Sequence, residues 1–358
     1  MTSGSLRSLA IVAALTLMAG CSSSPDASPT TTTPTTTTPT TTPQTTTSTT
    51  STTTTSSTTA TTEPTTAITA DQLMADVRIL TATPRSTEAQ RETTRVWLQH
   101  QLEASGYDVH RWTRADTSQS PAVPVNLVAR LAGTASPERV LIVSAHYDSV
   151  EGVVGADDDA SGVAAVLAVA RALATAHPKL GATIEFVFFD LEELGLLGSR
   201  AYVAEGIVGR TIIGVINLES VGYTCGEGCQ PVFTDIPGCL TVGGEVHAKG
   251  DNIVAVGDET ATDLMVALTA AARRVAPDRA LGTGLVAGNG TCMSVTRRSD
   301  HAPFWDAGIP AVMVTDLAEY RNTNYHRSTD VADTLDPAFL LDVTRTVAAA
   351  ALLAAGPD

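Results

Sequence analysis

Apolar runs and helix-like stretches alternate along the chain from about residue 68 to its end. The apolar runs cover residues 125–131, 140–144, 184–189, 211–218 and 311–314. Consecutive apolar positions are typical of strands buried on both faces of a sheet. Helix-like stretches cover residues 161–175, 196–204, 261–275 and 337–350. This alternation predicts one α/β domain, a three-layer α/β/α sandwich around a mixed sheet.

An earlier helix is predicted from its end signals. Thr87 and Gln90 have the spacing of a capping box, and Gly106 is a helix-ending residue. Trp97, Leu98 and Leu102 then lie on one face of the helix.

The first residues have the order of a secretory signal. Arg7 is followed by an apolar run over residues 9–18, which is too short to span a bilayer. The run ends in Gly20-Cys21 and so resembles a bacterial lipoprotein signal, which implies cleavage before Cys21 and a lipid on its thiol. An ordinary cleaved signal with a chance cysteine is the alternative. We therefore expect an exported protein, lipid-anchored through Cys21 on the outer face of the bacterial cell membrane, or secreted.

A threonine-rich tract separates this signal from the α/β region. Threonine occupies 26 of the 37 positions from 30 to 66, and most of the others are Pro or Ser. Such a tract has too little apolar area to offset the entropy of ordering the chain, so we expect a disordered spacer. The predicted organisation is a signal at 1–21, a linker at 22–67 and a catalytic domain at 68–358.

Composition narrows the class of partner. The formal net charge is -16, and only two of the 22 cationic residues are lysine. Nucleic-acid binding needs clustered cations, so we expect no nucleic-acid partner. We expect a monomer.

Four cysteines remain in the exported part: Cys225, Cys229, Cys239 and Cys292. An even number in an oxidising compartment favours two disulfides, in one of three connectivities. Three of the four lie in a glycine-rich, helix-poor stretch, 221–257, so their expected role is to fix that loop. Zinc binding by the thiols is less favoured, because no histidine follows at the required spacing.

Histidines and carboxylates gather directly after the predicted strands. In sheets of this kind, sites form where the carboxyl ends of the strands meet the loops. The side chains at these places, and in one loop near the C-terminus, are His146, Asp148, Asp157, Asp158, Asp159, Glu192, Glu193, Glu219 and His326. Imidazole and carboxylate are the ligands that zinc takes readily, and a pair of zinc ions needs one shared carboxylate. The set therefore favours two Zn²⁺ ions. The alternative interpretation of the acidic triplet is a helix N-terminus with favourable charge.

The order of these motifs carries a resemblance. His146-Tyr147-Asp148, the 155–162 segment around Asp158, Glu192-Glu193, Asn217-Leu218-Glu219, Ser299-Asp300-His301 and Tyr325-His326 follow one another at suitable spacing. Together they resemble the two-zinc aminopeptidase family, which includes secreted bacterial leucine aminopeptidases, glutamate carboxypeptidases and, more distantly, glutaminyl cyclases. The resemblance covers about residues 70–355 and implies a zinc-exopeptidase fold with a mostly parallel central sheet.

The resemblance also implies a role for each residue. Asp158 would bridge the zinc ions, with His146 and Glu219 completing one site and Glu193 and His326 the other. The remaining roles are Glu192 as general base, Tyr325 as the residue that stabilises the oxyanion, Asp148 as the carboxylate behind His146, and a cis peptide bond between Asp158 and Asp159. We expect Asp300, His301 and Asp330 to support the site from behind.

Two positions depart from the usual pattern of the family. Glu219 stands where many members have Asp, and Asp157 and Asp159 add negative charge beside the bridging Asp158. Neither change removes a ligand. The second zinc or a nearby acid such as Asp157 would then hold the free N-terminus of a peptide.

The favoured function is an aminopeptidase that acts on peptides with a free N-terminus. A zinc carboxypeptidase, dipeptidase or glutaminyl-cyclase-like enzyme on the same fold is the first alternative. Arg297 and Arg298 would favour a carboxypeptidase if they contacted a substrate carboxylate. A surface protein that binds without catalysis is the second alternative, but such a protein is expected to lack ligands, and none is missing here.

Overall fold

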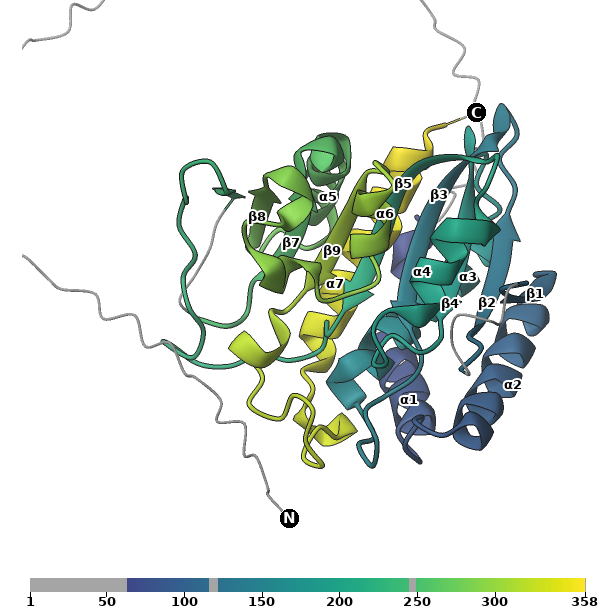
Figure 1. Ribbon diagram of the computed structural model, residues 1–358, viewed down its shortest axis with the longest axis horizontal. Coiled ribbons are helices and arrows are strands. Elements are labelled where there is room, and N and C mark those ends of the chain that lie inside the picture. The colour runs from purple at the N-terminus through teal and green to yellow at the C-terminus, as the bar shows by residue number, and fades with distance from the viewer. Residues whose placement is uncertain (1–62, 116–121, 245–248, 358) are drawn as a thin grey trace, which may run out of the picture. The chain divides into compact units, whose positions relative to one another are not determined.

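The computed structural model describes residues 63–115, 122–244 and 249–357. The expected signal, Cys21 and almost all of the linker lie outside these residues. The described part holds a nine-stranded sheet in the order β1-β2-β4-β3-β5-β9-β7-β8-β6 (Figure 1). The strands are β1 Val109–Thr113, β2 Val125–Leu131, β3 Ser136–His146, β4 Ala182–Phe189, β5 Thr211–Glu219, β6 Leu240–Gly244, β7 Ile253–Asp258, β8 Leu281–Val286 and β9 Ala311–Thr315.

The centre of this sheet is parallel and its flanks are mixed. Strands β4, β3, β5 and β9 pair in parallel, so their carboxyl ends meet at one edge. The β1–β2 and β2–β4 pairs on one side, and β9–β7 and β8–β6 on the other, are antiparallel, whereas β7–β8 is parallel. The mixed sheet is confirmed, and the parallel strands predominate in its centre.

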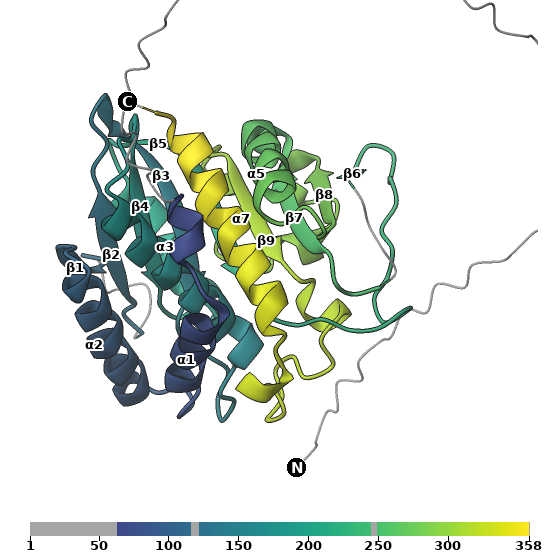
Figure 2. The ribbon, with the colours of Figure 1, turned by 180° about the vertical axis from the view of Figure 1, so that it is seen from behind.

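Helices cover both faces of the sheet. Helices α4 and α6 lie in front of it in Figure 1, and the view from behind shows α1, α3, α5 and α7 across the other face (Figure 2). The predicted capping box is present at the start of α2, which packs against α3 beside β1. The helices are α1 Ala70–Leu80, α2 Glu88–Ala104, α3 Gly162–Ala176, α4 Leu197–Ala201, α5 Thr262–Val275, α6 Ala302–Asp306 and α7 Pro337–Ala355.

The two most apolar helices form the main core. Helix α3 is buried along most of its length and packs against α7 and β3. The segments Ala156–Ala176 and Pro337–Ala355 are long and apolar enough to cross a membrane by composition alone, but most of each is buried inside the protein. Their hydrophobicity is therefore explained by packing.

The described part of the stretch 221–257 contains strands that were not predicted from the sequence. It contains β6 and the start of β7, which extend the sheet beyond β9. The two expected disulfides are present as Cys225–Cys229 and Cys239–Cys292. The first closes a short loop, whereas the second joins this stretch to the segment that follows β8.

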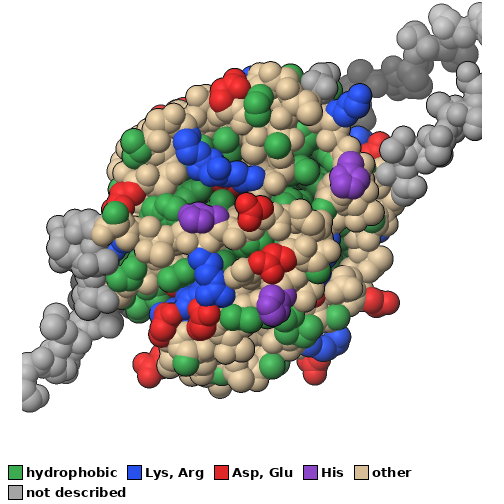
Figure 3. Space-filling model, turned by 90° about the vertical axis from the view of Figure 1, so that its right-hand side faces the viewer, with side chains coloured by type: hydrophobic (Ala, Val, Ile, Leu, Met, Phe, Trp, Pro, Cys, Tyr) green, Lys and Arg blue, Asp and Glu red, His purple; other side chains and the backbone are tan. Residues whose placement is uncertain are grey.

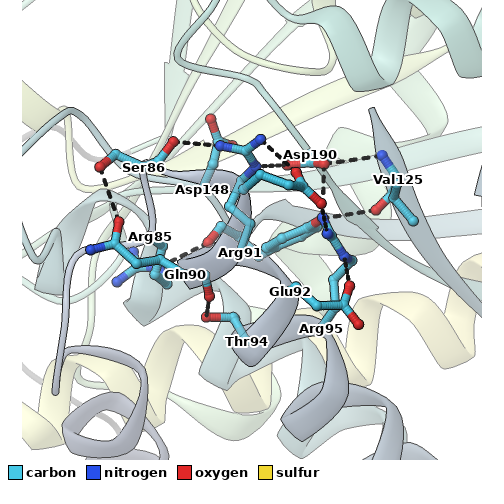
Figure 4. A network of polar contacts seen from close by, with 12 residues as sticks. Arg85, Ser86, Gln90, Arg91, Glu92, Thr94, Arg95, Val125, Asp148 and Asp190 are labelled. Atoms are coloured by element: carbon cyan, nitrogen blue, oxygen red, sulfur yellow. Dashed lines mark hydrogen bonds and ion pairs between the residues drawn. The ribbon is translucent and has the colours of Figure 1, made fainter. Parts of the chain in front are cut away.

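On the face of the molecule at the right of Figure 1, acidic and cationic side chains are interspersed (Figure 3). Beneath the surface, a buried ionic network joins α2 to the end of β4 (Figure 4). Arg91 Nε and Arg95 Nη1 lie 2.9 and 3.1 Å from the two carboxylate oxygens of Asp190, which directly follows β4. The N–H of Val125 also donates to Asp190 (3.0 Å). Burial raises the pKa of Asp190 to about 6, and the nearby Asp148 adds to this effect.

We predict that Asp190→Asn lowers the free energy of unfolding by about 3 kcal/mol, because Arg91 and Arg95 lose their fully buried acidic partner and keep acidic partners that are largely exposed. Urea denaturation monitored by circular dichroism measures the change. Glu92→Gln is the matched control, since Glu92 also pairs with Arg95 but has a side chain 44% exposed against 0% for Asp190. We expect the control to cost less than about 1 kcal/mol. An equal loss of unfolding free energy in both variants would show that burial of the Asp190 ion pairs does not determine their contribution to stability.

Candidate metal centre

The exit of β3 supplies the first histidine and its carboxylate. His146 is the last residue of β3, and Asp148 Oδ1 lies 3.4 Å from His146 Nδ1. The same carboxylate accepts the N–H groups of Glu192 (3.0 Å) and Glu193 (3.2 Å) in the loop after β4. Asp148 therefore ties the imidazole to the loop that carries the two glutamates.

Asp158 lies between the two histidines. Its Oδ1 is 3.1 Å from His146 Nε2, and its Oδ2 is 3.0 Å from His326 Nε2. The peptide bond between Asp158 and Asp159 is cis, as the resemblance implies. The Asp158 N–H donates to Asp330 (3.2 Å), which fixes the backbone of this turn.

A second carboxylate completes each half of the site. Glu219 Oε2 lies 3.6 Å from His146 Nε2, and Glu193 Oε2 lies 3.3 Å from His326 Nε2. Within each group, His146-Asp158-Glu219 and Asp158-Glu193-His326, one possible ligand atom from each residue lies within 4.8 Å of the others. The structure thus brings together all five residues predicted as metal ligands, in the two expected sets.

The polar atoms at the middle of these groups fit a metal ion. His146 Nε2, Asp158 Oδ2 and Glu193 Oε1 are buried, and their close contacts with other described residues, such as the 3.0 Å between Asp158 Oδ2 and His326 Nε2, lack hydrogen-bond geometry. Burying such atoms is costly unless a cation or donor satisfies them. Two imidazoles and three carboxylates are a donor set that suits zinc.

Electrostatics couple the histidines to the shared carboxylate. Burial alone would raise the pKa of Asp158, but the contacts with His146 and His326 outweigh it and lower that pKa. Burial likewise opposes the charged form of His326, yet Asp158 and Glu193 raise its pKa to about 10. These groups favour positive charge next to Asp158.

Glu192 and Tyr325 lie beside this centre. Burial raises the pKa of Glu192 well above its usual range, and the carboxylates of Glu219 and Asp300 add to the effect against the opposing His146. The ring of Tyr325 stacks on that of His326, with centroids 3.9 Å apart. A guanidinium nitrogen of Arg298 donates to the Tyr325 hydroxyl (3.4 Å).

The outer two acids of the triplet bind backbone amides. Asp159 accepts the N–H groups of His146, Gly162 and Ser220, and thereby braces the exits of two strands. Asp157 is 1% exposed, and its oxygens accept from the Gly222 N–H (2.8 Å) and the Asn322 side chain (2.8 Å). The expectation that Asp157 could hold a substrate N-terminus is therefore wrong, because its carboxylate is buried and occupied.

The three residues expected behind the site differ in their positions. Asp330 accepts the N–H groups of Asp157 and Asp158, so it supports the bridging turn and not His326 directly. Asp300 is buried close enough to His146 for their charges to interact, and burial raises its pKa to about 7. His301 bonds through Nε2 to the Thr296 carbonyl (2.7 Å) and packs on Trp305, away from the two ligand groups.

Two supporting elements were not predicted from the sequence. The first is a buried chain in which Ser144 donates to Asn217 (2.8 Å), Asn217 to Ser299 (2.8 Å) and Ser299 to Glu219 (2.7 Å). Asn217 and Ser299 belong to motifs noted in the sequence, but their partners lie on distant segments.

The second is Arg85, which is fully buried before α2. Its guanidinium donates to the carbonyls of Leu80, Tyr147, Val154 and Gly155. It therefore ties the exit of β3 to the loop before Asp158. Burial lowers its pKa, and Asp148 and Asp158 oppose that change.

A mostly apolar pocket opens beside the centre, with about 890 Å³ of empty space counted to its open mouth. Glu219 and Tyr325 line it, so it adjoins the predicted ligands. Its apolar lining includes Phe233, Leu240, Val242, Met293, Met313 and Leu317. Arg298 lines the same pocket and pairs with Glu319, whereas Arg297 is held by Asp306 (2.7 Å).

An α/β fold that presents histidines and carboxylates at the exits of parallel strands is typical of a metal-dependent hydrolase. A solved structure with a similar fold is the aminopeptidase from Aneurinibacillus sp. strain AM-1, with a TM-score of 0.61, 17% identity, and coverage of 82% of this chain and 96% of that one. This likeness shows the fold.

The model of peptidase family M28 matches residues 126–351. The uncharacterised Escherichia coli protein YfbL is 30% identical over 292 residues, which cover 74% of this chain and 82% of YfbL. The chain therefore belongs to peptidase family M28. This confirms the resemblance and the predicted class, a zinc-dependent peptidase of the aminopeptidase type.

Other curated relatives are longer than this chain. The probable lipoprotein aminopeptidase LpqL of Mycobacterium tuberculosis is 28% identical over 235 residues, which cover 59% of this chain and 41% of LpqL. The chain thus spans less than half the length of several relatives that it matches.

We predict that Arg85→Ala lowers both stability and zinc content, because four buried carbonyls lose their donor and the turn before Asp158 is no longer held. Thermal melting and the zinc bound per chain after dialysis measure the two effects. Arg85→Lys should recover only part of each, since one ammonium group cannot reach all four acceptors. Arg78→Ala is the control, because Arg78 is exposed at the end of α1. Full zinc content in Arg85→Ala would contradict the assigned role.

Proposed function

We propose that the protein is an aminopeptidase that uses two Zn²⁺ ions, with Asp158 shared between them. The observation that carries this proposal is the contact of the two Asp158 oxygens with His146 and His326, each of which has its own second carboxylate. His146 and Glu219 would hold one ion, and Glu193 and His326 the other. A carboxylate that contacts both histidines could be shared between two closely spaced ions.

Bound zinc would supply Lewis acidity toward a peptide carbonyl and toward water. Glu192 is the general base in this proposal. Burial raises its pKa above the usual range, which makes its carboxylate a stronger proton acceptor. In this proposal Glu192 takes a proton from water and returns it to the leaving amine. Its N–H donates to Asp148, so its backbone is held in the same unit as His146.

We propose that the hydroxyl group of Tyr325 donates a hydrogen bond to the developing oxyanion. Stacking on His326 fixes the plane of the ring, and Arg298 fixes the hydroxyl end. Both contacts reduce the number of orientations that the phenol can adopt before substrate binds.

The apolar pocket is proposed to take the side chain of the N-terminal residue. It adjoins both Glu219 and Tyr325, so a residue seated in it has its carbonyl near the proposed catalytic groups. Its lining favours a large apolar side chain, because transfer of such a group from water is favourable by about 25 cal/mol per Å².

The disulfides are those of an exported protein. We further propose a lipid anchor at Cys21, with the threonine-rich tract as a spacer that holds a monomeric catalytic domain away from the membrane. The order of residues before Cys21 and the similarity to a probable lipoprotein aminopeptidase support this proposal.

The zinc count tests the paired site. We predict two zinc ions per chain in the wild type by elemental analysis, about one in His326→Ala, and fewer than one in Asp158→Asn, because only Asp158 belongs to both groups. His110→Ala, outside both groups, should keep two. One ion in the wild type would contradict the paired centre and favour the cyclase-like alternative.

Activity tests the reaction. We predict chelator-sensitive release of the amine from leucyl or other large apolar aminoacyl anilides, and at least about a 1,000-fold loss of kcat in Glu192→Gln with zinc still bound. Glu151→Gln is the control, because Glu151 is exposed in a turn after β3. If no anilide in a broad panel were cleaved, the aminopeptidase proposal would be wrong.

A further inference from the structure

The apolar pocket has two outer walls that come from distant parts of the sequence. One wall includes Leu240 and Val242 on β6, and the other includes Met293 and Val295 in the segment after β8. Residues of β7, β8 and β9 also line the pocket, together with Phe233 and the segment 317–320. The distance between these two walls therefore determines which side chains the pocket accepts.

The Cys239–Cys292 disulfide joins the two walls directly at the pocket. Cys239 immediately precedes Leu240, and Cys292 immediately precedes Met293. The Cα atoms of the two cysteines are 5.7 Å apart. Both residues that follow the bridge thus belong to the pocket lining.

Apart from the disulfide, different contacts hold each of the two walls in place. Strand β6 is the last strand of the sheet and pairs with β8, from Leu240 opposite Val286 onward. In the other wall, Thr296 is held by His301, and Arg297 is held by Asp306. Toward its start, the Ala287 N–H donates to the Cys239 carbonyl (2.8 Å), and the Met293 N–H donates to the nearby Gly290 carbonyl (3.0 Å). Met293 also packs against the apolar cluster that contains Leu240. The disulfide adds the covalent link between the residue before Met293 and the residue before β6.

We propose that the Cys239–Cys292 disulfide is a specificity-determining cross-link, which sets the width of the apolar pocket and hence the preference for large apolar N-terminal residues. This inference rests on the proposed aminopeptidase function. Without the bridge, Met293 and Val295 can move away from Leu240, and a large side chain loses contacts on one side. A small side chain such as that of alanine makes few of these contacts, so its turnover depends little on the bridge.

The other disulfide provides a matched control. Cys225–Cys229 also lies in the 221–257 stretch, but it closes a loop with a sequence separation of only four residues. Its immediate neighbours in the sequence do not line the pocket. Removal of the Cys225–Cys229 bridge therefore shows the effect of losing a disulfide while the Cys239–Cys292 bond between the two walls is kept.

The test compares the double variants C239S/C292S and C225S/C229S with the wild type. The measured quantity is the ratio of kcat/KM for leucyl anilide to kcat/KM for alanyl anilide. We expect this ratio to fall about tenfold or more in C239S/C292S, mainly through the leucyl substrate, because lost contacts with even one methylene change discrimination by about that factor. In C225S/C229S the ratio should stay within about twofold of the wild type. An unchanged ratio in C239S/C292S would overturn the proposal.

A second readout does not depend on turnover. Hydrogen exchange of the zinc-loaded proteins, followed by mass spectrometry, should show faster exchange at residues 291–295 in C239S/C292S and no change there in C225S/C229S. Unchanged exchange at these residues would overturn the proposal even if no anilide were cleaved. Wild-type protein that cleaves no anilide would overturn the proposed function alone, and the exchange result would still decide the role of the bridge.

If C239S/C292S does not fold, a second double variant, C239A/C292V, takes its place. C239A/C292V removes the covalent link but fills the space with apolar side chains, so it keeps more of the packing. The same ratio and the same exchange measurement apply to it. A loss of selectivity in this variant with a melting temperature near that of C225S/C229S separates the proposed role from a general loss of stability.

Discussion

The shared contact of Asp158 with His146 and His326 is the constraint on which the site depends. The two imidazoles come from segments separated by 180 positions in the sequence, and they face opposite oxygens of one buried carboxylate. A carboxylate in this position must be oriented within narrow limits, because a small rotation would favour one histidine over the other. The supports of Asp158 explain how it is oriented: Asp330 holds its N–H, and Arg85 holds the carbonyls of the loop that precedes it.

Buried charge around the centre forms a connected scaffold. Asp148 binds the amides of both glutamates after β4, and Asp190, in the same loop, is anchored by two arginines of α2. The loop with Glu192 and Glu193 is thus fixed at both its start and its middle. Leu191, just before the glutamates, and His326 itself have left-handed backbone angles, with φ of 57° and 56°. Such angles cost about 1 to 3 kcal/mol for ordinary residues and persist where surrounding contacts determine them.

The central strands and the proposed metal ligands could be predicted from the sequence. The outer strands β6 and β8 and the pocket beside them could not. Strands β3, β4 and β5 each contain a mostly apolar run, and each ends directly before or at a histidine or carboxylate, so the geometry of a parallel sheet places those groups together. Strands β6 and β8 have the sequences Leu-Thr-Val-Gly-Gly and Leu-Gly-Thr-Gly-Leu-Val. Their glycines interrupt the apolar pattern that would have predicted a strand. The pocket was missed for the same reason, because its walls lie on these strands. Arg85 was missed because nothing local distinguishes a buried arginine that binds four carbonyls from an exposed one.

Strands β6 and β8 lie at one end of the sheet, so mutations that change the pocket affect a different part of the protein from mutations that change the proposed ligands. The proposed ligands stand at the ends of β3 and β5, in the turn before α3, in the loop after β4 and in the loop before α7. Much of the pocket lining stands on the last strands of the sheet and on the segment after β8. Mutations at that end can reshape the pocket without moving His146 or Asp158. Under the proposed function, changes on these outermost strands would alter which N-terminal residues the pocket accepts and leave the proposed ligands in place.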